Sequence, residues 1–312
     1  MKITYLFLIY KNPEIVFHTC KRLSGNGIRF LVHVDKNSNT DFSILYNVEG
    51  LEFADVRFAT AWGSSGLVKA TAHCLEYISA NYDTDYVVLM SESDYPVKSA
   101  DYISSYLQKS KKDFATANLL PCDHPLDNKN CYWMEGGMRR VNTYALYLNK
   151  KSIVSIEPKT VNWGNMRQFG KLMLNAPTKL PAALKLLFKS KRKPIEGFPW
   201  CGGDQWFILR KETIDKIVNS ILSNPLILEE ADNTFIPDEV TISTLIHALS
   251  PANERENITL RYIHWPSPKA KSPGAIQVGD TNLISELVEN KDLLFARKIE
   301  DIEVAKYIDS LL

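Results

Sequence analysis

The sequence is short of paired cysteines and of long apolar runs. None of its five cysteines forms a C-x-x-C pair, so the spacing excludes the common zinc clusters and favours reduced, scattered thiols in a cytosolic protein. No segment approaches the roughly 18 consecutive apolar residues of a membrane span. The apolar run at residues 3–10 is followed by YKNP with no small-residue cleavage site. We therefore predict that it is a buried strand rather than a signal peptide.

Two further absences narrow the classes of function. The sequence has neither G-x-G-x-x-G nor a P-loop, which argues against a dehydrogenase and against a P-loop NTPase. It also has no large excess of charge of either sign, because 37 basic and 36 acidic side chains leave a formal net charge of +1. With no recognition motif present either, we expect no nucleic-acid partner.

The first third of the chain alternates between strand-like and helix-like segments. The expected strands cover 3–10, 28–35 and 85–92, and the expected helices cover 13–23, 66–80 and 100–110. The strands are continuously apolar, which is typical of a sheet covered on both faces. Their alternation with helices predicts parallel βαβ units. The expected fold is therefore α/β, with a Rossmann-like, mostly parallel sheet and helices on both faces.

The remaining segments are less regular, and we see no repeats or linker. Residues 121–140 are rich in Pro, Asp, Asn and Gly and are typical of a long functional loop. A helix is expected over 237–249 and a strand over 258–265. We predict one domain spanning 1–312, with a nucleotide-binding half at 1–120 and an acceptor-binding and catalytic half at 121–312.

Acidic residues follow two of the three strands expected in the first third. Ligands of open α/β sheets bind at the carboxyl ends of the parallel strands, and these ends fall at Ile9, at Asp35 and at the segment SESDYP with Glu92 and Asp94. Carboxylates there can hold ribose hydroxyls or a uracil N–H. The sequence therefore predicts a nucleotide site that includes Ile9, Asp35 and Asp94.

A metal site has two candidate positions. The literal D-x-D of Asp83 and Asp85 precedes a strand, so we interpret it as a solvated turn at the wrong edge of the sheet. A metal-binding pair belongs instead where Glu92 and Asp94 stand, and hard cations accept such oxygen ligands. If any metal binds, these two side chains are the expected ligands.

Several tryptophans lie beside glycines and acids. Trp62 opens WGSSG, Trp200 and Trp206 flank CGGDQ, and Trp133 lies in the middle loop. Such tryptophans suit stacking against a sugar, while anchoring of a core or a loop is the alternative for each.

Seven segments in order carry a resemblance to a known family. They are VHVDK (32–36), AWGSSGLVKA (61–70), VVLMSESDYPVKS (87–99), GGDQWFILRK (202–211), PDEVTISTLI (237–246), LRYIHW (260–265) and FARK (295–298). Together they resemble the core-2/I-branching β-1,6-N-acetylglucosaminyltransferases, a family that also includes peptide O-xylosyltransferases. The resemblance spans residues 3–298. It implies a GT-A-like fold, a UDP-sugar donor, inversion at the anomeric carbon and no metal cofactor.

The resemblance also assigns roles to residues. The glutamate of PDE, Glu239, matches the family's catalytic base, and the last residue of FARK, Lys298, matches a diphosphate contact. Asp35 matches the uridine contact, and Trp62 matches the tryptophan of the loop beside the nucleotide. The family's diphosphate arginine is assigned to Arg261, with Lys269 and Lys271 as alternatives.

The chain departs from the family in two respects. The family usually has SG-x-D-[YF]-P where this chain has SESDYP, so Glu92 replaces a small residue and bears on metal independence. Eukaryotic members also carry a membrane anchor and many disulfides. Their absence here leads us to expect a bacterial, cytoplasmic enzyme.

The expected reaction is a single displacement, with Glu239 as general base and Lys298 stabilising the diphosphate that leaves. The expected donor sugar is N-acetylglucosamine. Xylosyl, glucosyl or galactosyl transfer, or a catalytically silent glycan- or nucleotide-binding protein, are the alternatives. The residues expected to position the glycan acceptor are Glu135, Arg139, Arg140, Trp200, Asp204 and Trp265.

A basic stretch at 179–194 carries six Lys or Arg residues and no acid. A basic amphipathic segment can lie on an anionic bilayer, while a solvated basic face is the alternative. We expect peripheral contact with the inner membrane face through this stretch, and an acceptor carried on a lipid.

Overall fold

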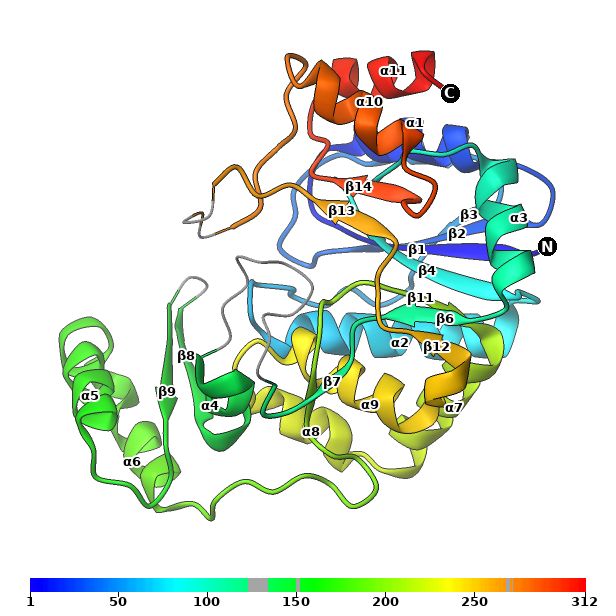
Figure 1. Cartoon of the computed structure of the whole chain (residues 1–312). Helices are drawn as coiled ribbons and strands as arrows, with labels where there is room; N and C mark the ends of the chain where they lie inside the picture. The colour runs from blue at the N-terminus through cyan, green and yellow to red at the C-terminus, as the bar shows by residue number, and fades with distance from the viewer. Residues whose placement is uncertain (123–133, 150–151, 268–269, 271) are drawn as a thin grey trace.

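A computed structural model describes residues 1–122, 134–149, 152–267, 270 and 272–312. Within them the main sheet has seven strands in the order β12-β6-β11-β4-β1-β2-β3 (Figure 1). Its strands are β1 (Ile3–Ile9), β2 (Ile28–Val34), β3 (Leu51–Phe53), β4 (Tyr86–Ser91), β6 (Asp113–Ala115), β11 (Phe207–Arg210) and β12 (Arg255–Glu256). In this sheet β11 is antiparallel to both neighbours, and the other pairings are parallel. The expected α/β class with a mostly parallel sheet is confirmed.

Helices cover both faces of this sheet. They are α1 (Pro13–Leu23) and α3 (Ala100–Ser110) on one face, and α2 (Ser65–Asn81), α7 (Lys211–Ser223), α8 (Leu226–Asp232) and α9 (Thr241–Leu249) on the other. Along β1, Tyr5 and Phe7 pack towards α1 and α3, whereas Leu6 and Leu8 pack towards α2. Because successive side chains of a strand point to opposite faces, both covered faces require the continuous apolar run that the sequence shows.

A second, three-stranded sheet lies beyond the end of β4. It contains β5 (Tyr95–Pro96), β13 (Arg261–Ile263) and β14 (Phe295–Arg297), ordered β13-β14-β5. Helices α10 (Thr281–Glu289) and α11 (Ile302–Ser310) pack on it with a separate apolar core. The expected strand 258–265 is therefore shorter than predicted, and it belongs to this sheet rather than to the main one.

A lobe with its own small core projects at one end of the molecule (Figure 1). It consists of the hairpin β8 (Tyr144–Asn149) and β9 (Ser152–Ile156), followed by α5 (Trp163–Asn175), η3 (Pro177–Lys179) and α6 (Leu180–Phe188). The remaining short elements are η1 (Ser43–Asn47), β7 (Asn118–Leu119), η2 (Met134–Gly137), α4 (Met138–Asn142), β10 (Cys201–Gly202), η4 (Pro237–Glu239) and η5 (Ala252–Glu254).

The helix expected over 237–249 is interrupted. Its first three residues form η4, and α9 begins only at Thr241. Ile236, which precedes η4, has a left-handed backbone with φ 53°, and neither Ile236 nor Val240 provides a side-chain cap. Asp238 and Glu239 therefore lie in a separate turn before the helix, and not in its first turn.

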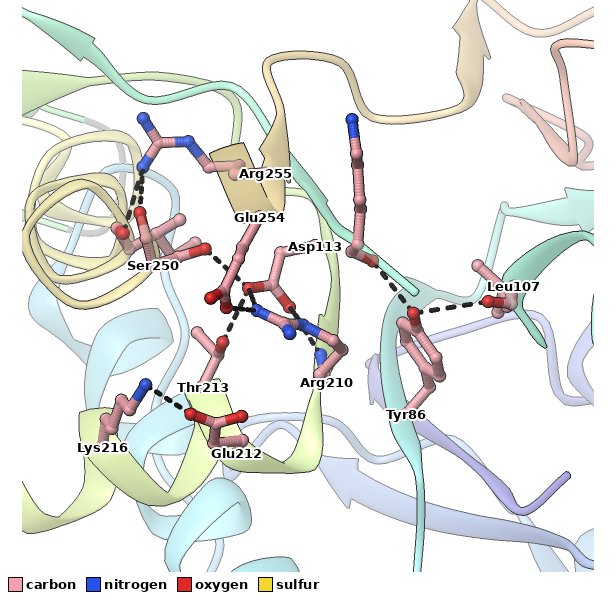
Figure 2. A network of polar contacts seen from close by, with 12 residues as sticks. Tyr86, Leu107, Asp113, Arg210, Glu212, Thr213, Lys216, Ser250, Glu254 and Arg255 are labelled. Carbon is pink, nitrogen blue, oxygen red and sulfur yellow. Dashed lines mark hydrogen bonds and ion pairs between the residues drawn. The ribbon is translucent and has the colours of Figure 1, made fainter. Parts of the chain in front are cut away.

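A buried polar network surrounds Asp113, the first residue of β6. Asp113 is fully buried, and its carboxylate accepts hydrogen bonds from the Arg210 backbone N at 2.7 Å and from Thr213 Oγ1 and Ser250 Oγ at 2.6 Å each (Figure 2). Arg210 also forms ion pairs with Asp113 and Glu254. Since Arg210 is opposite Tyr86 at the start of β4, this network lies at the amino ends of the strands and has a structural role.

One of the basic residues in the stretch 179–194 is buried. The Arg192 side chain is 1% exposed. It donates hydrogen bonds to Glu230 Oε2 at 2.7 Å, Thr234 Oγ1 at 2.6 Å and Thr143 O at 3.1 Å. Contrary to the expectation of a basic surface over the whole stretch, Arg192 joins the lobe to α8. Across the described residues, no helix is long and apolar enough to cross a membrane.

Candidate active site

A cavity of ≈450 Å³ opens at the carboxyl ends of β1, β2 and β4. This is the edge where open parallel sheets bind ligands, because the loops that follow the strands converge there. Segments from both halves of the chain line it. Its lining residues are Leu8, Ile9, Tyr10, Asp35, Asn37, Ser38, Thr60, Ala61, Trp62, Leu67, Ser91, Glu92, Ser93, Gln205, Trp206, Arg297, Lys298 and Glu300.

Four of the six residues predicted to bind the nucleotide line this cavity. Ile9 ends β1, Asp35 follows β2, Trp62 lies before α2, and Lys298 follows β14. The other two, Asp94 and Arg261, do not appear in the lining and are fully buried behind it. The alternatives Lys269 and Lys271, and also Trp133, lie outside the described residues.

Asp35 is held by the loop that follows β3. Its Oδ1 accepts a hydrogen bond from Asn37 N at 2.5 Å, and its Oδ2 accepts from Thr60 N at 2.6 Å and from the Thr60 hydroxyl. Burial alone would raise its pKa, but the hydrogen bonds from Thr60 and Asn37 outweigh it and lower the pKa below the ordinary value. The carboxylate is thus ionised and fixed, and it shapes the cavity wall by holding Thr60.

The Trp62 loop forms an exposed rim beside the cavity. The Trp62 side chain is 68% exposed, and its ring meets Phe235 edge-on with centroids 6.4 Å apart. Gly63 has φ 71°, and its carbonyl accepts a hydrogen bond from the Tyr147 hydroxyl of β8. The rim therefore contacts both the lobe and the segment that precedes Glu239.

Asp94 and Arg261 form a buried ion pair. Both side chains have no exposed surface, and Arg261 Nε lies 2.8 Å from Asp94 Oδ1. Asp94 Oδ2 accepts from Ser91 N at 2.7 Å and from Ser91 Oγ at 2.6 Å, and Arg261 donates to Leu89 O at 2.9 Å. The pair therefore stabilises the turn after β4 and does not itself face the cavity.

Two neighbouring cations line the cavity from the FARK segment. The Arg297 guanidinium lies over the Trp206 ring at 4.1 Å, on a ring that also contacts Arg261 at 4.6 Å. Burial and the adjacent Arg297 charge lower the pKa of Lys298. Cations held this close together favour an anion in the cavity, because it would relieve their repulsion.

Glu92 is a buried carboxyl in the same cavity. It is 6% exposed. Burial raises its pKa to about 7, and the nearby Asp94 charge adds to the rise, whereas Lys11 and Arg297 act against it. Lys11 itself donates a hydrogen bond to Glu300 Oε1 at 2.8 Å. Glu92 is therefore the acidic group of the cavity that titrates near neutral pH.

The predicted base, Glu239, lies next to the cavity but does not line it. Its backbone carbonyl accepts a hydrogen bond from Gly203 N at 2.9 Å, and Gln205 and Trp206, two and three residues further on, line the cavity. Gly203 is required there, because a Cβ would lie 1.8 Å from Thr116 O. The Glu239 side chain forms an ion pair with Arg140, which fixes its orientation.

The preceding residue, Asp238, is buried, whereas the Glu239 side chain is 28% exposed. Its Oδ1 has no hydrogen-bond partner. Burial raises its pKa to about 7, and the Glu239 charge raises it further, while Arg140 opposes the rise. Asp238 is thus an internal carboxyl of η4 and does not cap α9.

The residues predicted to hold the acceptor are spread along this side of the molecule. Arg140 contacts Glu239, and Asp204 accepts from the Thr116 hydroxyl at 3.2 Å. Trp200 lines a separate gap of ≈20 Å³ and stacks on Arg192 at 5.3 Å. The Trp265 indole N–H is buried without a hydrogen-bond partner. Glu135 is exposed in η2, and Arg139 lies in α4.

Metal ligands are sparse in the described part of the chain. No group of three His, Cys, Asp or Glu side chains there could hold a metal ion. Glu92 faces the cavity, but both oxygens of Asp94 already have partners in Ser91 and Arg261. The D-x-D contacts Lys2 instead, since Lys2 N donates to Asp85 at 2.7 Å and Lys2 Nζ pairs with Asp83. This confirms its position at the amino end of β4.

Among the cavity residues with no predicted role in binding a nucleotide, three stand out by their contacts with other lining residues or with the buried ion pair. They are Thr60, Trp206 and Arg297. The motifs GGDQW and FARK contain two of them, so a signal was present for Trp206 and Arg297. Thr60 belongs to no such motif, and only its hydrogen bonds to Asp35 reveal it.

The fold and the cavity define an α/β protein with a ligand site at the carboxyl ends of its parallel strands. A sequence profile of the family described as Core-2/I-Branching enzyme matches residues 3–123 and 142–287, so the chain belongs to this family. The predicted family resemblance is thereby confirmed.

Individual relatives are distant. The chain is 31% identical over 83 residues to Xylosyltransferase oxt of Drosophila melanogaster, which is 25% of this chain and 10% of that protein. It therefore spans about a tenth of the length of this relative.

Similar solved structures are also remote. They include mannose-1-phosphate geranyltransferase from Thermus thermophilus (12% identity, TM-score 0.30, covering 74% of this chain and 64% of that one). Another is galactosyltransferase LgtC with donor and acceptor sugar analogues (12% identity, TM-score 0.27, covering 60% and 67%).

Proposed function

We propose that this chain is an inverting glycosyltransferase that moves N-acetylglucosamine from a UDP-sugar to a hydroxyl of a glycan acceptor. One observation carries the proposal. A cavity of ≈450 Å³ at the carboxyl ends of the strands combines Asp35, Trp62, Arg297 and Lys298 in a chain of the Core-2/I-Branching enzyme family.

The donor binds in the cavity with its nucleotide towards Ile9, Asp35 and Trp62. Its diphosphate lies against Arg297 and Lys298, whose positive charges replace a metal ion in stabilising the leaving group. Asp94 and Arg261 support this region from behind and do not touch the donor. Two adjacent cations in the same cavity, Arg297 and Lys298, support binding of an anion of this kind.

The chemical step is one displacement at the anomeric carbon. An acceptor hydroxyl attacks C1 from the face opposite UDP, the bond from C1 to the phosphate oxygen breaks, and UDP leaves with the electron pair. Glu239 takes the hydroxyl proton. Its place beside Gln205 and Trp206 through the Gly203 hydrogen bond supports this role, and general-base catalysis contributes about 10²–10⁴-fold in rate.

The acceptor binds on the Glu239 side of the cavity. We assign its positioning to Glu135, Arg139, Arg140, Asp204, Trp200 and Trp265, with Arg140 and Asp204 nearest the reaction because of their contacts. The acceptor glycan is carried on a lipid at the cytoplasmic membrane face. The exposed lysines of the stretch 179–194 support this location.

Xylose is the second candidate donor sugar, because a matching relative is a xylosyltransferase.

Release of UDP from UDP-N-acetylglucosamine, UDP-xylose, UDP-glucose and UDP-galactose, each with and without EDTA, tests the proposal. We expect release to be fastest with UDP-N-acetylglucosamine and unchanged by EDTA. UDP binding without turnover on any donor would instead indicate a silent binding protein. Activity lost in EDTA and restored by Mn²⁺ would overturn the metal-free mechanism.

A further inference from the structure

Helix α5 has two apolar faces, and only one of them is covered. Leu172 is fully buried in the core of the lobe with Phe169 packed against that core. On the opposite side, the four most exposed apolar residues of the helix are Trp163 (79%), Met166 (57%), Met173 (63%) and Leu174 (87%). These positions are spaced i, i+3, i+10 and i+11, so they form one stripe along the helix.

Two neighbouring positions extend this exposed surface, one between its members and one just before the helix. Gly170 lies between Met166 and Met173, and a Cβ there would meet no atom within 4 Å. Val161, just before the helix, is 91% exposed. Scattered exposed apolar residues are normal, but among the described residues seven of the eighteen large ones fall between 161 and 188. Such a concentration marks an interaction surface.

The charge of this region indicates the partner. Residues 158–195 contain nine Lys or Arg and no Asp or Glu, whereas the rest of the chain has 28 basic and 36 acidic side chains, a net charge of −8. Arg192 is buried, and Lys179 donates to Tyr147 O at 2.6 Å. Arg167 and Lys171 are exposed on α5 directly beside the stripe, and Lys171 also donates to Ile153 O at 3.0 Å. Lys185 is exposed on α6, which packs against α5.

We propose that this face of α5, defined by Trp163, Met166, Met173 and Leu174, docks on an anionic lipid bilayer. Tryptophan and methionine enter the headgroup region, where an amphipathic ring is favoured, and the neighbouring basic side chains, above all Arg167 and Lys185, contact lipid phosphates. A second copy of the chain fits less well, because pairing this face with itself brings two acid-free basic surfaces together. Membrane contact therefore centres on α5, upstream of the stretch 179–194.

The lobe is connected to the cavity rim. Tyr147 of β8 donates to Gly63 O, and Gly63 follows Trp62 of the cavity lining. A lobe resting on a bilayer would therefore keep the cavity close to that surface, which suits a lipid-borne acceptor. This last point rests on the proposed function, whereas docking itself does not.

Co-sedimentation with vesicles tests the docking. The full chain is mixed with vesicles of phosphatidylcholine alone or with phosphatidylglycerol, at low and high salt. We expect binding only to the anionic vesicles, and weaker binding at high salt. The double variants W163S/L174S and R167E/K185E should each lower the partition coefficient about tenfold or more.

Matched controls change similar side chains elsewhere. L222S/L226S alters two exposed leucines of α7 and α8, which are 58% and 55% exposed, and K109E/K291E makes the same change of charge outside the lobe. Both should bind vesicles like the unmodified chain. Thermal unfolding and UDP release, measured on every variant, separate a loss of docking from a loss of folding or of the proposed activity.

Three outcomes would overturn the proposal. They are no binding to anionic vesicles, equal binding to neutral vesicles, and binding that W163S/L174S and R167E/K185E leave unchanged. Self-association in sedimentation velocity that W163S/L174S abolishes, without vesicle binding, would assign the face to a second copy instead.

Discussion

The two sides of the site that we propose for the donor and for the acceptor are built differently. On the donor side, Asp35 and Asp94 bind backbone N–H groups and neighbouring hydroxyls, so short segments at the strand ends fix each other, and Arg261 supports Asp94 from behind the cavity. On the acceptor side, Glu239 is oriented by Arg140, which is 99 residues away in sequence and comes from another element. Mutations should therefore distinguish the residues that support the cavity from the residues that we propose to react in it.

The largest effect is expected at the residue that we propose to react. Glu239→Gln keeps the shape of the side chain but removes its capacity to accept a proton, so the turnover rate should fall about 10²–10⁴-fold. UDP affinity should change little, because Glu239 does not line the cavity. The measurement is steady-state UDP release together with calorimetric UDP binding. Glu229→Gln, on the surface of α8, is the control, and near-normal turnover by Glu239→Gln would exclude this base.

The buried ion pair should affect stability rather than chemistry. Asp94→Ala leaves Arg261 buried without its partner, so the free energy of unfolding should fall by about 3–5 kcal/mol. Chemical denaturation measures this difference. Asp83→Ala breaks the exposed pair with Lys2, whose partners are 83% and 51% exposed, and should have no measurable effect. If both variants lowered the free energy of unfolding equally, burial of the ion pair would not determine its contribution to stability.

The two cations of the cavity should matter for the leaving group. Arg297→Ala and Lys298→Ala each remove a positive charge next to the proposed diphosphate, and turnover should fall about 10²–10³-fold. UDP should also bind more weakly in both variants, as measured by calorimetry. Lys291→Ala removes a charge outside the cavity and serves as the control. If the two cavity variants bind UDP like the unmodified chain, the diphosphate does not lie against them.

The smallest effect is a dependence on pH that passes through Glu92. Its pKa is raised from 4.5 to about 7, so between these values the folded protein holds a proton that the unfolded chain has lost. Stability from this group is therefore present at acid pH and declines as the pH rises towards 7. Above about pH 7, ionised Glu92 should also repel a diphosphate and weaken UDP binding severalfold.

Glu92→Gln provides the test of this pH dependence. The variant should bind UDP with an affinity that changes less between slightly acid and slightly alkaline buffer, and its unfolding should vary less with pH. A UDP affinity that depends on pH equally in both proteins would assign the dependence to another group. Burial also raises the pKa of Asp238 to about 7, so Asp238 would then be the next residue to change.

The sequence by itself determined the central strands and the edge that carries the site. Strands buried on both faces must be continuously apolar, so 3–10, 28–35 and 85–92 were recognisable, and the acids after them marked the carboxyl ends. The family motifs added Trp62, Glu239 and Lys298. These features are local, because each depends on residues adjacent in the chain.

Only the tertiary structure decided which polar groups meet and which apolar faces are covered. Arg297 stacks on Trp206, and Arg261 pairs with Asp94, through contacts between segments far apart in the sequence. The sequence of α5 shows apolar residues on two sides, but it does not tell which side is buried. Packing of Leu172 against the hairpin buries one face of the helix and leaves Trp163 and Leu174 exposed on the other. Burial depends on neighbours brought in by the rest of the fold, so no local pattern specifies it.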